Sequence, residues 1–512
     1  MAEAAITLQN VTKRFGSVEA NRDVSMEIRR GEILALLGEN GSGKTTLMNM
    51  LAGIYYPDEG KILVDGKHVN IRDPKDAYAL GIGMVHQHFK LVDVFSAVEN
   101  VMVGGGKKRG DVREARAKIR EICDKYGFSV DPDKKVYDMS VSEKQTLEII
   151  KVLYRGARIL ILDEPTAVLT PQETEKLFAV MRNMKADGKT VVIITHKLHE
   201  VLSISDRVAI LRKGEYIDCV DTETASTESL TEMMVGKKVD LNIERPQVEK
   251  KQLRIEVKGL NCYNAEGVQV LKNVDFELYS GEILGIAGVS GNGQKELLES
   301  IAGLQTVLPG ASIIYHPPGG KEGVELIGKT PRQIRELGVH LSFVPEDRLG
   351  MGLVGTMGMW ENMMLKDYSV GRGIFTDKKK PRELAEQVRK ELKVVTPGLS
   401  TPVRRLSGGN VQKVLVGREI AAAPAVLMTA YAVRGLDINA SYTIYQLLNE
   451  QKLSGVAVIY VGEDLDVLLE LCDRILVLCG GQVSGILDGR SAKKEELGRK
   501  MTTVEVAADA GV

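Results

Sequence analysis

The chain has 512 residues, too many for one ordinary hydrophobic core, so two or more domains are expected. Its 68 Lys and Arg residues nearly balance 69 Asp and Glu residues, so the overall charge favours neither nucleic acid nor an anionic membrane as the main partner. The first residues lack a signal-peptide pattern, and no apolar run reaches the roughly 18 residues that a membrane span needs. We therefore expect a soluble protein that is not exported.

The sequence contains two copies of one unit. Residues 31–53 align without a gap with residues 281–303, and SDRVAIL at 205–211 matches CDRILVL at 472–478. In both copies, short β-branched or Leu-rich runs alternate with helical stretches. This alternation predicts α/β domains, each built on a largely parallel, buried sheet.

The repeat and the composition between the copies set the domain boundaries. We predict a first domain at 1–240, a polar linker at 241–252, a second domain at 253–503 and a disordered tail at 504–512. Between about residues 90 and 138 the first copy departs from the α/β pattern and predicts an inserted helical subdomain. The apolar residues at helical spacing there are Ala115, Ile119, Ile122, Cys123 and Tyr126.

A phosphate-binding loop follows the first strong strand signal of the first copy. The pattern GxxxxGK[ST] is matched by Gly38, Glu39, Asn40, Gly41, Ser42, Gly43, Lys44 and Thr45, with Thr46 continuing into a helix. The glycines allow backbone N–H groups to surround phosphates, and the helix start adds positive potential. Lys44 is expected to reach the outer phosphates of ATP and Thr45 to bind Mg²⁺.

An acidic pair ends a later apolar strand, ILILDEP at 159–165. We expect Asp163 to bind Mg²⁺ and Glu164 to orient and deprotonate the attacking water. Such a pair is weak evidence alone, but combined with the upstream phosphate loop it predicts ATP hydrolysis.

Together with these elements, Gln87 in MVHQHF, His196 in IITHK and LSGGN at 406–410 resemble the ATP-binding cassette (ABC) family. The resemblance implies two tandem P-loop NTPase domains, each with an inserted helical subdomain. It also implies that Gln87 senses Mg²⁺ and the attacking water, that His196 contacts the terminal phosphate, and that Phe15 stacks on adenine. In this family each ATP lies between the phosphate loop of one cassette and the signature motif of the other.

The second copy departs from the family pattern in its catalytic motifs. Its phosphate loop retains Gly288, Gly291 and Gly293, but Gln294 stands at the lysine position and Lys295 at the hydroxyl position. The residues at the acidic pair, the glutamine and the histidine are Ala430 and Tyr431, Glu346, and Glu463. We therefore expect no hydrolysis by these residues, and weak or regulatory nucleotide binding there stays open.

The signature motifs diverge in the opposite sense. The second copy keeps Ser407, Gly408 and Gly409, whereas the first has Met139-Ser140-Val141-Ser142-Glu143. By the family's pairing rule, the intact phosphate loop and intact signature would form one complete site with Lys44, Thr45, Gln87, Asp163, Glu164 and His196. The defective motifs would meet in the other site.

The asymmetry of the cassettes, with TAVLTPQE after the acidic pair and VPEDR in the second copy, resembles the ATPase subunit of bacterial importers of nucleosides or simple sugars. The HQHF segment favours the nucleoside type. This resemblance implies two membrane permease subunits, an extracellular binding protein or lipoprotein, and a location on the cytoplasmic face of the membrane. The alternative is a non-transport tandem cassette acting on ribosomes or DNA. It is disfavoured by the short linker, the defective site and the absence of a cysteine-based zinc module, and we expect no nucleic acid partner.

Overall fold

The computed structural model describes residues 3–16, 18–87, 89–103, 111–167, 169–238, 241–264, 267–289, 291–320, 322–343, 349, 352–365, 376–420, 424–434, 436–462 and 464–503. The predicted tail 504–512, Glu346 and Glu463 lie outside these ranges. The chain divides into two compact units, residues 1–240 and 241–512. Within the described ranges, no helix is both long enough and apolar enough to cross a bilayer.

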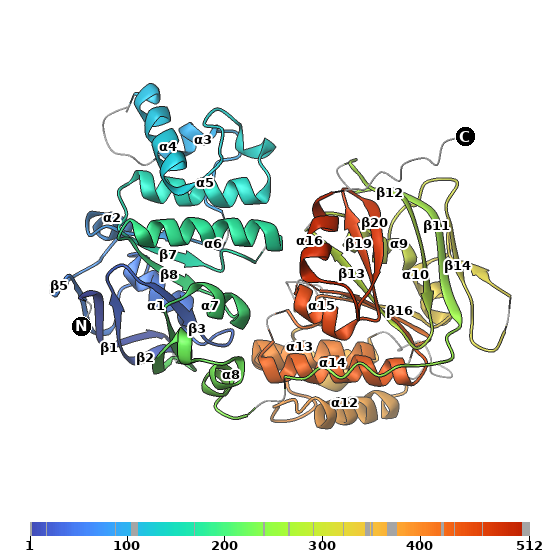
Figure 1. The fold of residues 1–512 in the computed structure, drawn as a ribbon. Helices are drawn as coiled ribbons and strands as arrows, with labels where there is room; N and C mark the ends of the chain where they lie inside the picture. The colour runs from blue at the N-terminus through green and yellow to red at the C-terminus, as the bar shows by residue number, and fades with distance from the viewer. Residues whose placement is uncertain are drawn as a thin grey trace, which may run out of the picture. The chain divides into compact units, whose positions relative to one another are not determined.

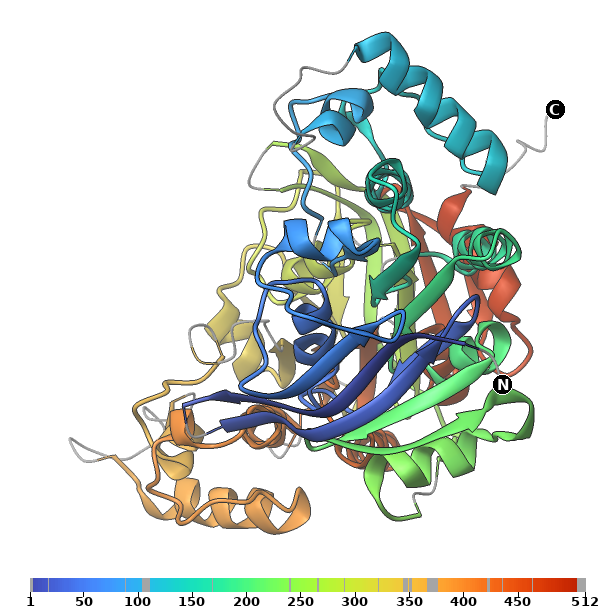
Figure 2. The same ribbon diagram turned by 90° about the vertical axis from the view of Figure 1, so that its left-hand side faces the viewer.

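The first unit contains an antiparallel sheet, a mainly parallel sheet and a group of helices (Figures 1 and 2). Its strands are β1 (Ala4–Phe15), β2 (Val18–Arg29), β3 (Ile33–Leu37), β4 (Glu59–Val64), β5 (Lys67–Val69), β6 (Ile82–Val85), β7 (Ile159–Asp163), β8 (Thr190–Ile194), β9 (Arg207–Arg212) and β10 (Glu215–Asp221). Its helices are α1 (Lys44–Leu51), α2 (Pro74–Ala79), α3 (Ala97–Met102), α4 (Val112–Tyr126), α5 (Val141–Tyr154), α6 (Pro171–Ala186), α7 (Leu198–Ile204) and α8 (Thr227–Val235).

The second unit repeats these elements in the same order. Its strands are β11 (Leu253–Tyr263), β12 (Gln269–Tyr279), β13 (Ile283–Gly288), β14 (Ser312–Tyr315), β15 (Val324–Glu325), β16 (Val339–Phe343), β17 (Val426–Ala430), β18 (Ala457–Val461), β19 (Arg474–Cys479) and β20 (Gln482–Asp488). Its helices are α9 (Gln294–Ile301), α10 (Pro331–Glu336), α11 (Met359–Met364), α12 (Lys379–Glu391), α13 (Gly408–Ile420), α14 (Ile438–Leu453), α15 (Leu465–Leu471) and α16 (Lys494–Thr502).

Each unit has the same two sheets. In the first, the six-stranded sheet has the order β10-β9-β3-β8-β7-β6, and all its neighbours are parallel except β9 and β10. The second unit has the corresponding order, β20-β19-β13-β18-β17-β16. The predicted parallel, buried sheet is thereby confirmed. The four-stranded antiparallel sheet β2-β1-β4-β5, and its counterpart β12-β11-β14-β15, did not follow from the sequence analysis.

The inserted helices begin and end at local sequence signals. Asp111 accepts a hydrogen bond from the Arg113 N–H and caps α4, and Gly127 ends the helix in the left-handed conformation with φ 84°. The buried face of α4 consists of the five apolar residues that its periodicity predicted. Helices α3, α4 and α5 contact one another, as do α11, α12 and α13 in pairs along the chain. Each unit therefore carries a helical subdomain.

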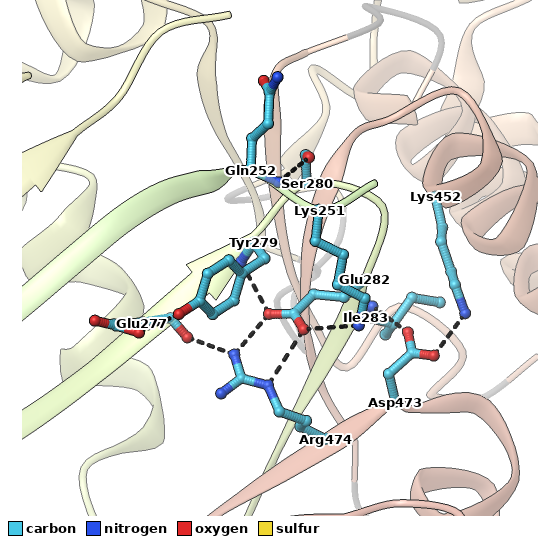
Figure 3. A network of polar contacts seen from close by, with 10 residues as sticks. All are labelled: Lys251, Gln252, Glu277, Tyr279, Ser280, Glu282, Ile283, Lys452, Asp473 and Arg474. Atoms are coloured by element: carbon cyan, nitrogen blue, oxygen red, sulfur yellow. Dashed lines mark hydrogen bonds and ion pairs between the residues drawn. The ribbon is translucent and has the colours of Figure 1, made fainter. Parts of the chain in front are cut away.

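A polar network at the amino-terminal edge of the parallel sheet occurs in both units. In the second unit, Asp473 accepts a hydrogen bond from the Ile283 N–H at 2.9 Å and pairs with Lys452 at 2.8 Å (Figure 3). In the first unit, Asp206 accepts from the Ile33 N–H at 2.8 Å and pairs with Lys185 at 2.5 Å. The network thus fixes the start of the strand that leads to each phosphate loop.

The predicted linker, residues 241–252, lacks helix and strand and lies against the second unit. The Arg245 guanidinium donates to the carbonyl oxygens of Leu469 at 2.9 Å and Cys472 at 2.6 Å, so its charge lies at the C-terminal end of α15. Lys251 pairs with the buried Glu282 at 3.4 Å, as Figure 3 shows. Because these contacts hold the segment, it belongs structurally to the second unit.

The two equivalent lysine–aspartate pairs predict a difference in stability. The Lys452 side chain is fully buried, whereas that of Lys185 is 40% exposed. Lys452→Met should therefore lower the free energy of unfolding of the second unit by about 3 kcal/mol, because it leaves Asp473, whose side chain is only 11% exposed, without its cation. Lys185→Met should cost about 1 kcal/mol or less. The single tryptophan, Trp360, lies in the second unit, so urea unfolding followed by tryptophan fluorescence measures the first effect directly. Circular dichroism follows the unfolding of both units. Equal decreases in the free energy of unfolding in the two variants would contradict the prediction.

Candidate functional site

The phosphate loop of the first unit joins β3 to α1 in a conformation that requires glycine. A Cβ atom on Gly38 would lie 2.3 Å from the Leu211 carbonyl oxygen, and one on Gly43, which has φ 94°, would lie 2.3 Å from the Ala20 carbonyl oxygen. The buried Ser42 hydroxyl has no hydrogen-bond partner among the described residues. An unpaired buried hydroxyl beside a helix start suits a phosphate ligand.

Lys44 begins α1 and folds its side chain back over this loop. Its Nζ donates to the carbonyl oxygens of Gly38 at 2.7 Å and Glu39 at 3.0 Å, and the residue is only 6% exposed. Burial lowers the pKa of the Lys44 ammonium, and the nearby carboxylates of Glu164 and Asp163 act in the opposite direction. The loop therefore holds a buried cation at a place where it can pair directly with a phosphate.

The acidic pair lies at the carboxyl end of β7. Asp163 is its last residue, and its Oδ1 is 3.4 Å from the Thr45 hydroxyl, which donates to it. Burial, and then the charge of Glu164, raise the pKa of Asp163 to about 6. Glu164 has the left-handed φ of 46°, and its backbone N–H donates to the Ile194 carbonyl oxygen. This turn directs the two consecutive carboxylates to different partners.

Glu164 receives hydrogen bonds from two residues that are distant in the sequence. Gln87 Nε2 donates to Glu164 Oε2 at 3.0 Å, and His196 Nδ1 lies 3.0 Å from Glu164 Oε1. Burial would raise the pKa of Glu164, but the His196 hydrogen bond and charge bring it below its ordinary value. The structure thus brings Gln87, Glu164 and His196 together around an ionised carboxylate, the form that a general base requires.

The oxygen donors beside this carboxylate fit Mg²⁺ bound with a nucleotide. Thr45 and Asp163 present hard oxygen atoms within 3.4 Å of each other. The Gln87 amide is hydrogen-bonded to the neighbouring carboxylate, that of Glu164. The described residues contain no cluster of three or more His, Cys, Asp or Glu side chains that could hold a metal ion by itself. Mg²⁺ commonly takes few protein ligands and fills its shell with phosphate oxygens and water, so this donor set is appropriate.

Phe15, the expected adenine contact, ends β1 with 44% of its surface exposed. Its ring meets that of Tyr55 edge to face at a centroid distance of 5.1 Å, and Lys13 Nζ lies 5.4 Å from its centroid. An exposed aromatic ring held in this way can stack on a planar base. The sequence reasoning missed Tyr55, since residues 40 positions apart in a single sequence carry no sign of contact.

The phosphate loop of the second unit has the same backbone shape with different side chains. Gly291 and Gly293 have φ of 89° and 96°, close to the 79° and 94° of Gly41 and Gly43. Gln294 takes the place of Lys44, is 5% exposed and donates to the Val289 carbonyl oxygen at 3.2 Å. Lys295 points away, with its side chain 53% exposed and 3.7 Å from Glu299. A buried neutral amide thus replaces the buried cation. The Gln294 side chain also packs against Gly288, because a Cβ atom on Gly288 would lie 2.6 Å from Gln294 Nε2.

The second unit also keeps the turn after the acidic strand without the acids. Strand β17 ends at Ala430, and the next residue, Tyr431, has the left-handed φ of 57°. Its backbone N–H donates a hydrogen bond to the Val461 carbonyl oxygen at 2.9 Å. These contacts match those of Glu164. The described part of this turn therefore provides the backbone of a catalytic site but no carboxylate base.

The two signature segments begin helices in different ways. In the first unit, Ser140 and Glu143 form a capping box at the start of α5, and Glu143 pairs with Lys134 at 2.7 Å. A carboxylate thus already occupies the positive end of this helix. In the second unit, Ser407 precedes α13, and a Cβ on Gly409 would meet no atom within 4 Å. Open space and small residues leave the start of α13 accessible to an anion.

Comparisons with known proteins agree with this geometry. The family model described as "ABC transporter" matches residues 21–167 and 271–429. The nucleoside import ATP-binding protein NupA of Lactococcus lactis is 41% identical over 97% of both chains. The guanosine import ATP-binding protein NupO of Bacillus subtilis is 38% identical over 98% of this chain and 97% of its own. The ribose import ATP-binding protein RbsA 1 of Rubrobacter xylanophilus is 36% identical over 96% of this chain and 97% of its own.

Proposed function

The chain belongs to the ABC transporter family, and from this premise we propose that it is the ATP-hydrolysing subunit of an importer of nucleosides. The observation that carries the proposal is the asymmetry between the units. Lys44, Asp163 and Glu164 in the first unit correspond to Gln294, Ala430 and Tyr431 in the second. Hydrolysis then takes place with the catalytic residues of the first unit alone.

In the proposed mechanism, the first phosphate loop and Lys44 bind the phosphates of ATP, and Phe15 stacks on adenine. Thr45, Asp163 and Gln87 would hold Mg²⁺, which would supply positive charge to the phosphates. Glu164 orients the attacking water and accepts its proton, while His196 supports Glu164 and contacts the terminal phosphate. For Ser407, Gly408 and Gly409, at the accessible start of α13, we propose a role in binding phosphate oxygens of ATP, as the family resemblance implies.

The transporter would contain this chain on the cytoplasmic face of the membrane with two permease subunits and an extracellular substrate-binding protein or lipoprotein. ATP hydrolysis would then drive the permease cycle. Support comes from the import function in the names of the relatives that span nearly the whole chain. Two of these names specify nucleosides, whereas the ribose protein supports a simple sugar as the second candidate cargo.

Uptake by the assembled transporter tests this proposal. The chain, co-expressed with its permeases and binding protein in a bacterium that lacks nucleoside uptake, should import labelled nucleosides with saturable kinetics. Unlabelled nucleosides should compete, and ribose should not. Ribose uptake without nucleoside uptake would replace the cargo by the second candidate. No uptake of either compound by a transporter that still hydrolyses ATP would refute both cargoes.

A further inference from the structure

Glu148 is a buried carboxylate without a part in the mechanism described above. It lies in α5 between Leu147 and Ile149 and is 4% exposed. Its Oε1 accepts a hydrogen bond from the Lys90 backbone N–H at 2.6 Å, and its carboxylate pairs with Lys151 at 3.2 Å. Since burial of a carboxylate is unfavourable, a helix that only needed to pack would carry an apolar residue here.

Lys151 makes a second hydrogen bond to the backbone of Lys90, and we call the two bonds together the grip on Lys90. Its Nζ donates to the Lys90 carbonyl oxygen at 2.8 Å, so the pair from α5 binds both polar backbone groups of Lys90. Lys90 follows Gln87 by three residues, and Gln87 donates to Glu164. The contacts therefore anchor the chain immediately after the residue that touches the proposed base.

The second unit provides an internal comparison. The gapless alignment of the signature helices places Leu415 at the position of Glu148 and Arg418 at that of Lys151. Arg418 donates to the Gly352 carbonyl oxygen at 3.1 Å, so the cation keeps a loop contact, while buried Leu415 offers no acceptor. A carboxylate at this helix position is thus present only in the unit that has Glu164, whereas in the second unit Arg418 pairs with the buried Glu419 at 2.8 Å, one position further along.

A second contact to the same loop is present in both units and can be compared with the contact of Glu148. Asn100 exchanges hydrogen bonds with the backbone of Val92 at 2.8 and 3.0 Å. Asn362 does the same with Val354 at 2.9 and 3.2 Å. A contact retained in both units serves the shared fold of the loop. Among the described residues, a bond from a helix carboxylate to the loop N–H is found only in the unit with the base, which points to a role in hydrolysis.

We propose that Glu148 is a positioning residue that, with Lys151, fixes Lys90 and thereby holds Gln87 against Glu164. This inference rests on the proposed catalytic roles of Gln87 and Glu164. Glu148 itself touches neither nucleotide nor water and acts through Gln87. Small displacements of a catalytic group lower the rate strongly, so loss of the grip reduces turnover more than ATP binding.

The first test compares Glu148→Gln with Glu32→Gln in the full chain. Glu32 is a matched control because it is 6% exposed, accepts the Arg29 N–H at 2.6 Å and pairs with Arg207 at 3.4 Å, all at the opposite edge of the sheet. For Glu148→Gln we expect kcat to fall about tenfold with KM for ATP changed less than about twofold. Glu32→Gln should leave kcat unchanged. The proposal is overturned if Glu148→Gln has the kcat of the wild type while its melting temperature falls as much as that of Glu32→Gln.

The second test asks whether the effect passes through Gln87. In a Gln87→Ala background, Glu148→Gln should lower kcat no further, because the residue that it positions is gone. A tenfold loss in both backgrounds would sink the proposal. If Glu148→Gln folds poorly, both measurements are repeated with Glu148→Leu, which introduces the residue found at the equivalent position of the second unit. Glu164→Gln separates the two hypotheses: full turnover in that variant refutes the proposed base, whereas loss of turnover there with normal Glu148 variants refutes only the positioning role.

Discussion

In the Glu164→Gln variant, ATP turnover is expected to fall at least about 100-fold while ATP binding persists, because a positioned general base contributes at least that factor. The amide can still accept a hydrogen bond and fits the same space, but it cannot take a proton from water. Asp163, Thr45 and Lys44 remain in place for the nucleotide. Phosphate release under saturating ATP and Mg²⁺, together with equilibrium binding of a fluorescent ATP analogue, measures the two effects separately.

The equivalent position in the second unit supplies the control. Tyr431 has the same left-handed backbone as Glu164, so Tyr431→Gln places the same side chain on the same turn. This variant should hydrolyse ATP within about twofold of the wild type, since a proton-accepting residue is not removed. A loss in Tyr431→Gln as large as that in Glu164→Gln would mean that the second unit takes part in the chemistry.

Replacement of Lys44 by glutamine, the residue of the second unit, is expected to lower kcat/KM by about 100-fold or more. The ammonium group is the buried cation of the first phosphate loop, and a neutral amide cannot balance the phosphate charge that develops during transfer. Unlike Glu164→Gln, this variant should also bind ATP more weakly. Titration with the fluorescent analogue and steady-state hydrolysis together distinguish the two variants.

Gln294→Ala is the matched change in the second unit. Gln294 donates to a loop carbonyl much as Lys44 does, but carries no charge. We expect hydrolysis to remain within about twofold of the wild type, because truncation there removes no cation from the catalytic centre. A strong loss in Gln294→Ala would instead give the second phosphate loop a part in turnover.

Much of the fold followed from the sequence because its signals are local or repeated. The apolar run at 159–162 and the glycine pattern at 38–45 specify a buried strand and a phosphate loop within a few residues. The periodicity of 115–126 gave the buried face of α4. The duplication then extended each inference to the second half. The antiparallel sheet was missed because β1 pairs with β4 across more than 40 residues, a contact that strand pattern alone does not specify.

The site shows the same division between local and distant information. Family resemblance selected Gln87 and His196, and the structure places both within hydrogen-bond distance of Glu164. Glu148 was missed although a charged residue inside the apolar run 147–150 is a visible signal in the sequence. Its meaning depends on Lys90, 58 residues away in the chain, and on the leucine at the equivalent place. The leucine can be found by aligning the two copies, but the contact with Lys90, which gives the difference its meaning, is visible only in the structure.

The left-handed backbone shared by Glu164 and Tyr431 also bears on the history of the chain. A side-chain-bearing residue in this conformation is disfavoured by about 1 to 2 kcal/mol, yet the second half has kept it without a carboxylate to position. Divergence after duplication therefore altered side chains on an inherited main chain. The second half thus keeps the same main-chain turn as the first half and carries a tyrosine on it in place of a carboxylate.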